Sequence, residues 1–169
     1  MVIDPLKTLR DIGNDISVAL NNGAYAGAII LTYAAIDAMS FLSMPMNQKE
    51  VQGRDFINWV EKYMRTDPNQ PYQYNGIDLF GARCGIVHRY GATSRLSDSG
   101  ESKIFQYHNG GNHIYKPDIH ENLVAISWSR LIADFFSAMD RFLGDIMNDT
   151  ALNKRVASRI NHLFQVSPI

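Results

Sequence analysis

The chain has 169 residues, of which 46% are hydrophobic and 20% charged, and its formal net charge is −1. These are the proportions of an ordinary globular protein, and the length fits one domain spanning residues 1–169. A charge so close to zero excludes a general attraction to nucleic acid or anionic lipid, so any RNA binding requires a local basic patch. The single cysteine, Cys84, excludes an internal disulfide and is typical of a reducing cytosol.

The first part of the chain predicts three helices. Apolar residues recur at helical spacing between residues 5 and 20. The stretch 24–43 is apolar nearly all round and is followed by Pro45, which predicts a central, buried helix. Because this stretch carries Asp37, we expect a core helix and no membrane span. A third helix is predicted over 50–65. With no basic segment before an apolar one at the N-terminus, we expect no signal peptide and a cytoplasmic protein.

The second part predicts a hairpin among further helices. Two short runs flank Asn109-Gly110-Gly111, and glycines accept the positive φ that hairpin turns need. The predicted elements are a loop over 66–75, a helix from 76 to 88 or 90, a polar segment over 91–102, a β-hairpin over 103–116, and helices over 117–147 and 151–164. The sum is an all-α bundle of about five to six helices with one small inserted hairpin.

The segment Arg83-Cys84-Gly85-Ile86-Val87-His88 is the most informative pattern. Arginine is permanently charged and binds a phosphate with two parallel hydrogen bonds, while histidine gains or loses a proton near neutral pH. Cleavage of RNA by its own 2′-hydroxyl needs a base for that hydroxyl and a positive group beside the negatively charged phosphorane. It needs no metal. These two side chains could supply both functions.

The spacing of this pair raises a geometric question. Positions five apart on a regular helix lie about 140° apart around its axis, so Arg83 and His88 would point to different sides. They can meet if the helix loosens near Gly85 or ends by His88. The alternative is that the two residues pair across a dimer.

Residues 81–88, Gly-Ala-Arg-Cys-Gly-Ile-Val-His, resemble the signature of the HEPN superfamily. That resemblance implies a helical bundle, a homodimer with the motif at its interface, and a metal-independent endoribonuclease without a cofactor, often of the toxin or defence type. By position, Arg83 would contact the scissile phosphate and His88 would act as base or acid. Active members usually carry a polar residue after the arginine. Here Cys84 occupies that place, and the other interpretation of Cys84 is a small buried filler.

Asp37 is the next candidate, as a supporting residue. Burying a carboxylate inside an apolar helix costs on the order of several kcal/mol of folding free energy unless the charge is paired. Arg83 is its natural partner, and the family often places an acidic residue on an early helix near the arginine. The pair could orient the guanidinium for catalysis, or could be a structural salt bridge. Both interpretations remain open at this point.

The remaining candidates have ordinary explanations beside the functional ones. Arg89, Tyr90 and Arg95 follow the motif and could form a basic, aromatic patch for a single RNA strand, or could be solvated loop residues. His108, His113 and His120 could suggest a metal, but no cysteine or acidic pattern supports one, so we expect solvated histidines and no metal site. Lys154, Arg155 and Arg159 are interpreted as the solvated face of the last helix.

Two functions therefore stand against each other. The first is a homodimeric, metal-independent endoribonuclease built on Arg83 and His88, acting on RNA and controlled by an antitoxin or another protein partner. The alternative is a catalytically silent helical module that binds a protein partner or a nucleotide, with Asp37 and Arg83 as a structural pair. Cys84 and the near-zero charge favour the module, while the complete Arg/His pair in a glycine-bearing helix favours the nuclease.

Overall fold

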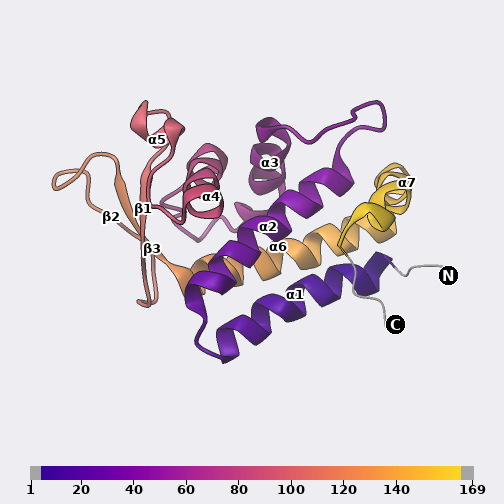
Figure 1. The fold of residues 1–169 in the computed structure, drawn as a ribbon, viewed down its shortest axis with the longest axis horizontal. Helices are drawn as coiled ribbons and strands as arrows, with labels where there is room; N and C mark the ends of the chain where they lie inside the picture. Colours follow the sequence, from indigo (N-terminus) through magenta and orange to yellow (C-terminus); the bar gives the residue numbers. More distant parts are fainter. Residues whose placement is uncertain (1–4, 165–169) are drawn as a thin grey trace.

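The computed structural model describes residues 5–164, which form a mostly helical fold with a small sheet at one end (Figure 1). The helices are α1 (Pro5–Asn21), α2 (Tyr25–Ser43), α3 (Gly53–Trp59) continued by the π-helix η1 (Val60–Met64), α4 (Gly76–Arg89), the short α5 (Arg95–Asp98), α6 (Trp128–Asn148), and α7 (Thr150–Arg159) continued by the 3-10 helix η2 (Ile160–His162). The strands are β1 (Ile104–His108), β2 (Ile114–Tyr115) and β3 (Leu123–Ser127). The helical character is as the sequence predicted.

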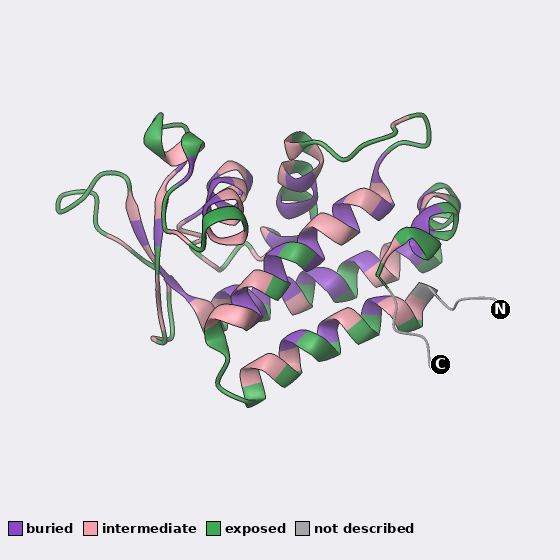
Figure 2. Cartoon of the chain, in the orientation of Figure 1, coloured by how far each residue is buried: buried purple, intermediate pink, exposed green. Residues whose placement is uncertain are grey.

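Helix α2 forms the centre of the bundle. It contacts α1, α3, α4, α6 and α7, and Tyr33, Ile36 and Met39 on it are fully buried (Figure 2). Within residues 5–164, α2 is the one helix whose length and composition would allow it to cross a membrane, and half of its apolar window is buried in the fold. A helix buried in a protein core can have the same length and hydrophobicity as a membrane-spanning helix. Its packing is that of the central helix expected from the sequence.

The predicted hairpin over 103–116 is wrong. Strands β1 and β2 do not pair with each other, because β3 lies between them, parallel to β1 and antiparallel to β2. The loop after β1 instead contacts the end of β3: the Ser127 hydroxyl donates to the Gly110 carbonyl, and the Ser127 N–H donates to His113 Nδ1. Gly110 and Gly111 therefore lie in a loop that contacts β3, and not in a hairpin turn.

The predicted start of the long helix at residue 117 is also wrong. Residues Leu123–Ser127 form β3, in which Val124 and Ile126 are fully buried, and α6 begins only at Trp128. The Ser127 hydroxyl accepts a hydrogen bond from the Arg130 N–H and so caps the helix. The apolar residues of this segment fit a helix and a half-buried strand equally well. Pairing with β1 determines that this segment forms a strand.

The last helix is fastened to the end of α2 by an arginine. Arg159 is 7% exposed, and its Nη1 and Nη2 donate to the carbonyls of Met44 and Pro45 at 2.7 and 2.8 Å. These carbonyls follow the last turn of α2, where positive charge is favourable. The interpretation of Arg159 as part of a solvated face is therefore wrong.

Candidate functional site

Helix α4, which carries the Arg/His motif, is fixed at its start by reciprocal capping. The Asn75 side chain accepts from the Asp78 N–H, and the Asp78 carboxylate accepts from the Asn75 N–H. Asp78 also accepts from the backbone N–H of Lys103 at 2.8 Å, which joins α4 to the beginning of β1. The position of α4 along the neighbouring elements is thus set by a buried carboxylate.

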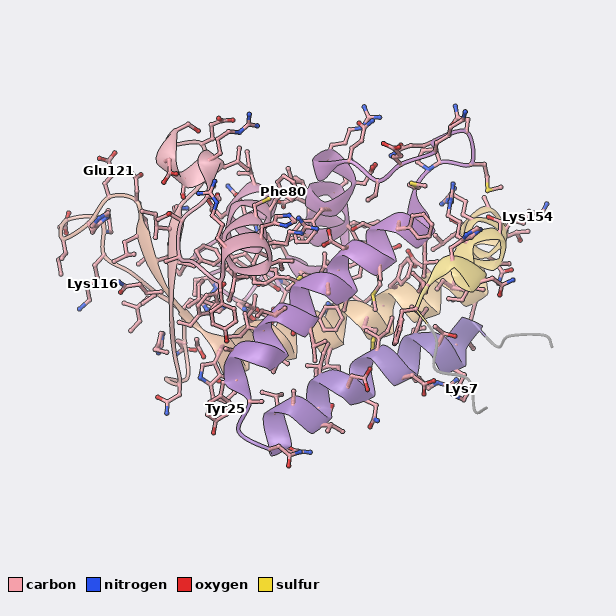
Figure 3. The ribbon with its side chains drawn as sticks, viewed as in Figure 1. Lys7, Tyr25, Phe80, Lys116, Glu121 and Lys154 are labelled. Atoms are coloured by element: carbon pink, nitrogen blue, oxygen red, sulfur yellow. The ribbon has the colours of Figure 1, made fainter. Side chains whose placement is uncertain are left out.

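The structure brings Asp37, Arg83 and His88 together between α2 and α4. Arg83 Nε and Nη2 each lie 2.7 Å from Asp37 Oδ2, and Arg83 Nη1 lies 2.7 Å from His88 Nε2. The side chains of Arg83 and Asp37 are 20% and 25% exposed, and His88 is exposed. Figure 3 labels Phe80, which lies on α4 three residues before Arg83. We call these three residues the triad.

The two motif residues meet within one chain, near the end of α4. The Tyr90 N–H contacts the carbonyls of both Gly85 and Ile86, and Tyr90 itself adopts a left-handed conformation with φ 53°. The Gly91 N–H also reaches the Gly85 carbonyl, at 3.2 Å. Arg83 and His88 both lie within α4, so the long Arg83 side chain spans the angular separation expected from the spacing, and the last turn of the helix widens just after His88.

Gly85 has a packing role in this arrangement. A Cβ at this position would lie 2.7 Å from the Thr93 carbonyl oxygen and 2.9 Å from that of Gly91. The loop after α4 thus folds back against the helix at the level of the motif. Only a residue without a side chain allows this approach.

Replacing Gly85 by alanine should lower the free energy of unfolding by about 1–3 kcal/mol, the range for overpacked sites. The matched control is Gly144→Ala in α6, where a Cβ meets nothing within 4 Å. That change should raise stability by about 0.5–1 kcal/mol through helix propensity. Urea unfolding of both variants gives the comparison. Equal stabilisation by the two changes would contradict the close loop contact.

The hydrogen bond between Arg83 and His88 determines the form of the imidazole. A guanidinium has only donors, so His88 Nε2 must accept, which leaves the proton of a neutral imidazole on Nδ1. Asp37 occupies Nε and Nη2 of the guanidinium, and Nη1 faces His88. One Arg83 nitrogen and one histidine lone pair thus lie side by side near the surface. Such a pair can bind an acidic oxygen and accept a proton from a neighbouring hydroxyl.

Burial raises the pKa of the Asp37 carboxyl above its ordinary value, although the charge of Arg83 acts in the opposite direction. The folded chain therefore holds the Asp37 proton more tightly than the unfolded chain. Its contribution to stability is complete below the ordinary pKa of about 3.9 and is lost as the pH rises through the raised value. At neutral pH the desolvation of the ionised carboxylate therefore offsets its attraction to Arg83, as is common for partly buried salt bridges.

Asp37→Asn should accordingly leave the free energy of unfolding at pH 7 unchanged or higher. Lowering the pH should then raise the free energy of unfolding of the parent relative to that of the variant, because only the parent has a carboxylate at residue 37 that can take up a proton. Urea unfolding of both proteins between pH 7 and pH 4 measures this difference. If acid instead lowers the free energy of unfolding of the parent relative to that of the variant, Asp37 and Arg83 form an ion pair that stabilises the fold.

The weaker candidates lie around the triad without bonding to it in residues 5–164. Cys84 is half-buried, and Arg89, Arg95 and Tyr90 are exposed, with Tyr90 at 71%. Arg89 and Tyr90 end α4, and Arg95 begins α5.

The expectation of a solvated histidine is wrong for His113. Its side chain is 2% exposed, and its Nε2 lies 3.7 Å from the carboxylate of buried Asp134. Asp134 also accepts from the Tyr74 hydroxyl at 2.9 Å and the Gln70 amide at 2.8 Å. The sequence analysis missed this polar cluster, although an acid in the apolar run Leu131–Phe136 is a detectable signal. In the described part of the chain, no three potential ligands form a metal-binding group.

No family model, curated protein or solved structure matches this chain.

Proposed function

We propose that this protein is a cytoplasmic, HEPN-like endoribonuclease that cleaves RNA without a metal, with Arg83 and His88 as its catalytic residues. The observation that carries the proposal is the contact between the Arg83 guanidinium, which Asp37 holds, and the exposed imidazole of His88. Asp37 is the positioning residue, since it holds the guanidinium through two nitrogens. Burial raises the pKa of Asp37, so its pairing with Arg83 adds little to stability at neutral pH, which is compatible with a positioning role.

The reaction follows from these positions. A phosphodiester oxygen binds Arg83 Nη1 and displaces the His88 contact, which frees the Nε2 lone pair. His88 Nε2 takes the proton of the 2′-hydroxyl as the 2′-oxygen attacks phosphorus. The bond from phosphorus to the 5′-oxygen breaks, the 5′-oxygen takes a proton from water, and a 2′,3′-cyclic phosphate remains. Arg83 balances the negative charge that develops on the phosphorane.

A homodimer formed through this face is part of the proposal. The positions at helical spacing from the triad are apolar and only partly covered: Ala34 is exposed, Leu31 is 37% exposed, and Phe80 and Val87 are half-buried. Apolar surface around polar residues marks interaction sites. A second copy would narrow the site around an RNA strand, and an antitoxin-type protein would block it by covering the same face.

The test is incubation of purified protein with an unstructured RNA in EDTA, followed by analysis of the new ends. We expect cleavage that persists in EDTA and leaves cyclic phosphate and 5′-hydroxyl ends. Cleavage that requires added metal, or ends of another type, would contradict the proposed chemistry.

The second candidate is a catalytically silent module that binds a protein partner or a nucleotide. Cys84 favours it, because a thiol is a weak hydrogen-bond partner at a position where active members of the family carry a polar group. The net charge of −1 also favours it. In that case expression is harmless, RNA stays intact, and His88→Ala changes only thermal stability.

Tyr90 gives a separate prediction about RNA binding. Its left-handed backbone costs an ordinary residue about 1 kcal/mol, and glycine adopts it freely. Tyr90→Gly should therefore fold at least as stably as the parent, yet bind single-stranded RNA about tenfold more weakly if the ring stacks on a base. Fluorescence anisotropy measures the affinity, and Tyr90→Asn is the matched second variant. Unchanged RNA affinity in both would remove Tyr90 from the site.

A further inference from the structure

A cavity lies between the end of α2, the α3–η1 segment and α7. Its volume is about 210 Å³. Met44, Trp59 and Leu152 give it apolar walls, and Asn58, Lys62 and Arg155 give it polar ones. None of the residues in the proposed ribonuclease site belongs to it.

Two nitrogen donors among the lining residues have no partner within residues 5–164. Trp59 is 2% exposed and its Nε1 is buried, and Nε of half-buried Arg155 is likewise covered. Leaving a buried donor without an acceptor is unfavourable, so most such groups in proteins are satisfied. Both belong to residues that line this cavity, so its wall offers few acceptors within the described chain.

The charges around the cavity favour a negative acceptor. Lys62 donates to the Tyr63 hydroxyl and to Asp145, which leaves one of its three protons for another partner. Asp55 also lines the cavity, but its Oδ2 already accepts from the Gln52 N–H and the Gln48 amide at the start of α3. The cavity therefore has two cationic side chains, Lys62 and Arg155, against the one carboxylate of Asp55, whose Oδ2 is already engaged.

A further cation lies behind the cavity wall. Arg159 binds the carbonyls of Met44 and Pro45, both of which line the cavity. Burial and the nearby positive charge of Arg155 both lower the pKa of Arg159. The two arginines therefore lie close enough to repel each other, and an anion between α7 and α2 would relieve this repulsion.

We propose that this cavity binds a small organic anion through its carboxylate or phosphate group. Arg155 and Lys62 contact the oxygens of that group, and Trp59, Met44 and Leu152 pack against the apolar remainder. The volume lies below the roughly 300 Å³ at which pockets for drug-sized ligands begin, which restricts the ligand to a small molecule.

Trp59 provides a direct readout for the test. The chain has two tryptophans, so Trp128→Phe leaves Trp59 as the sole indole, and it preserves an aromatic ring against Tyr25. This protein is titrated with acetate and with inorganic phosphate at an ionic strength held constant by sodium chloride. We expect a saturable change in Trp59 fluorescence with at least one of the two anions, and the tighter anion identifies the preferred group.

Variants decide whether the cavity is responsible. Arg155→Gln should weaken binding about tenfold or more, since it removes a charge-assisted hydrogen bond. Lys154→Gln, an exposed neighbour outside the cavity, should leave the affinity unchanged. Circular dichroism checks the fold of each variant, and Lys62→Gln replaces Arg155→Gln if that protein does not fold. A response that never saturates, or one that is equal in Arg155→Gln and Lys154→Gln, would overturn the proposal.

Discussion

Replacing His88 by alanine is expected to lower the rate of RNA cleavage by about 100- to 10,000-fold, the usual contribution of a positioned general base. The fold should persist, because His88 is exposed and its contact is the single hydrogen bond with Arg83 in the described chain. The free energy of unfolding should therefore stay within about 0.5 kcal/mol of the parent. Single-turnover cleavage of a labelled RNA in EDTA, with urea unfolding in parallel, provides both values.

The matched control is His120→Ala. His120 is also exposed, and it lies in the loop before β3. Its replacement should leave cleavage unchanged. Equal loss of activity in the two variants would assign the effect to general damage, and full activity of His88→Ala would remove the histidine from the proposed mechanism.

Arg83→Met is expected to lower cleavage by about 100- to 1,000-fold, because it removes the charge that stabilises the phosphorane. It should also destabilise the protein by about 1–3 kcal/mol, since it leaves the Asp37 carboxylate partly buried and unpaired. Combining it with Asp37→Asn should restore most of the lost stability and none of the activity. Urea unfolding and RNA cleavage of the two single variants and the double variant form one complete cycle.

The control for that cycle is Arg89→Met, which removes an exposed arginine six positions along the same helix. Its effect on stability should be small, and its effect on cleavage should appear in RNA affinity. If the double variant regains activity with its stability, Arg83 serves the fold alone. The silent module would then explain the protein better than the nuclease.

The helices could be predicted from sequence because apolar periodicity and helix-ending residues act locally. The α2 assignment follows from its nearly continuous apolar stretch, and the α4 boundaries follow from Asn75 and the glycine after Tyr90. Strand β3 could not be found in the same way. Its pairing with β1 joins Ile104 to Leu123, and a local pattern carries no information about such a partner.

The site was predictable to a similar extent. The pairing of Asp37 with Arg83 follows from the presence of a single acid in α2, which requires a partner. The contact between Arg83 and His88 could be stated only as one of two alternatives, since it depends on the geometry of the last turn of α4. The acid in the apolar run Leu131–Phe136 signals that Asp134 needs a partner, but the identity of that partner, His113, depends on long-range packing. The cavity between α2, the α3–η1 segment and α7 depends on long-range packing as well.

The bonds from Arg159 to the end of α2 have a consequence for synthesis. The donor and acceptor residues are separated by 115 and 114 positions, so they leave the ribosome far apart in time. A nascent chain can form α2 and α4 early, but the carbonyls after α2 stay open to solvent until α7 has emerged. Ribosome-bound chains stopped before residue 159 should therefore be more sensitive to proteases at residues 44–52 than the released protein.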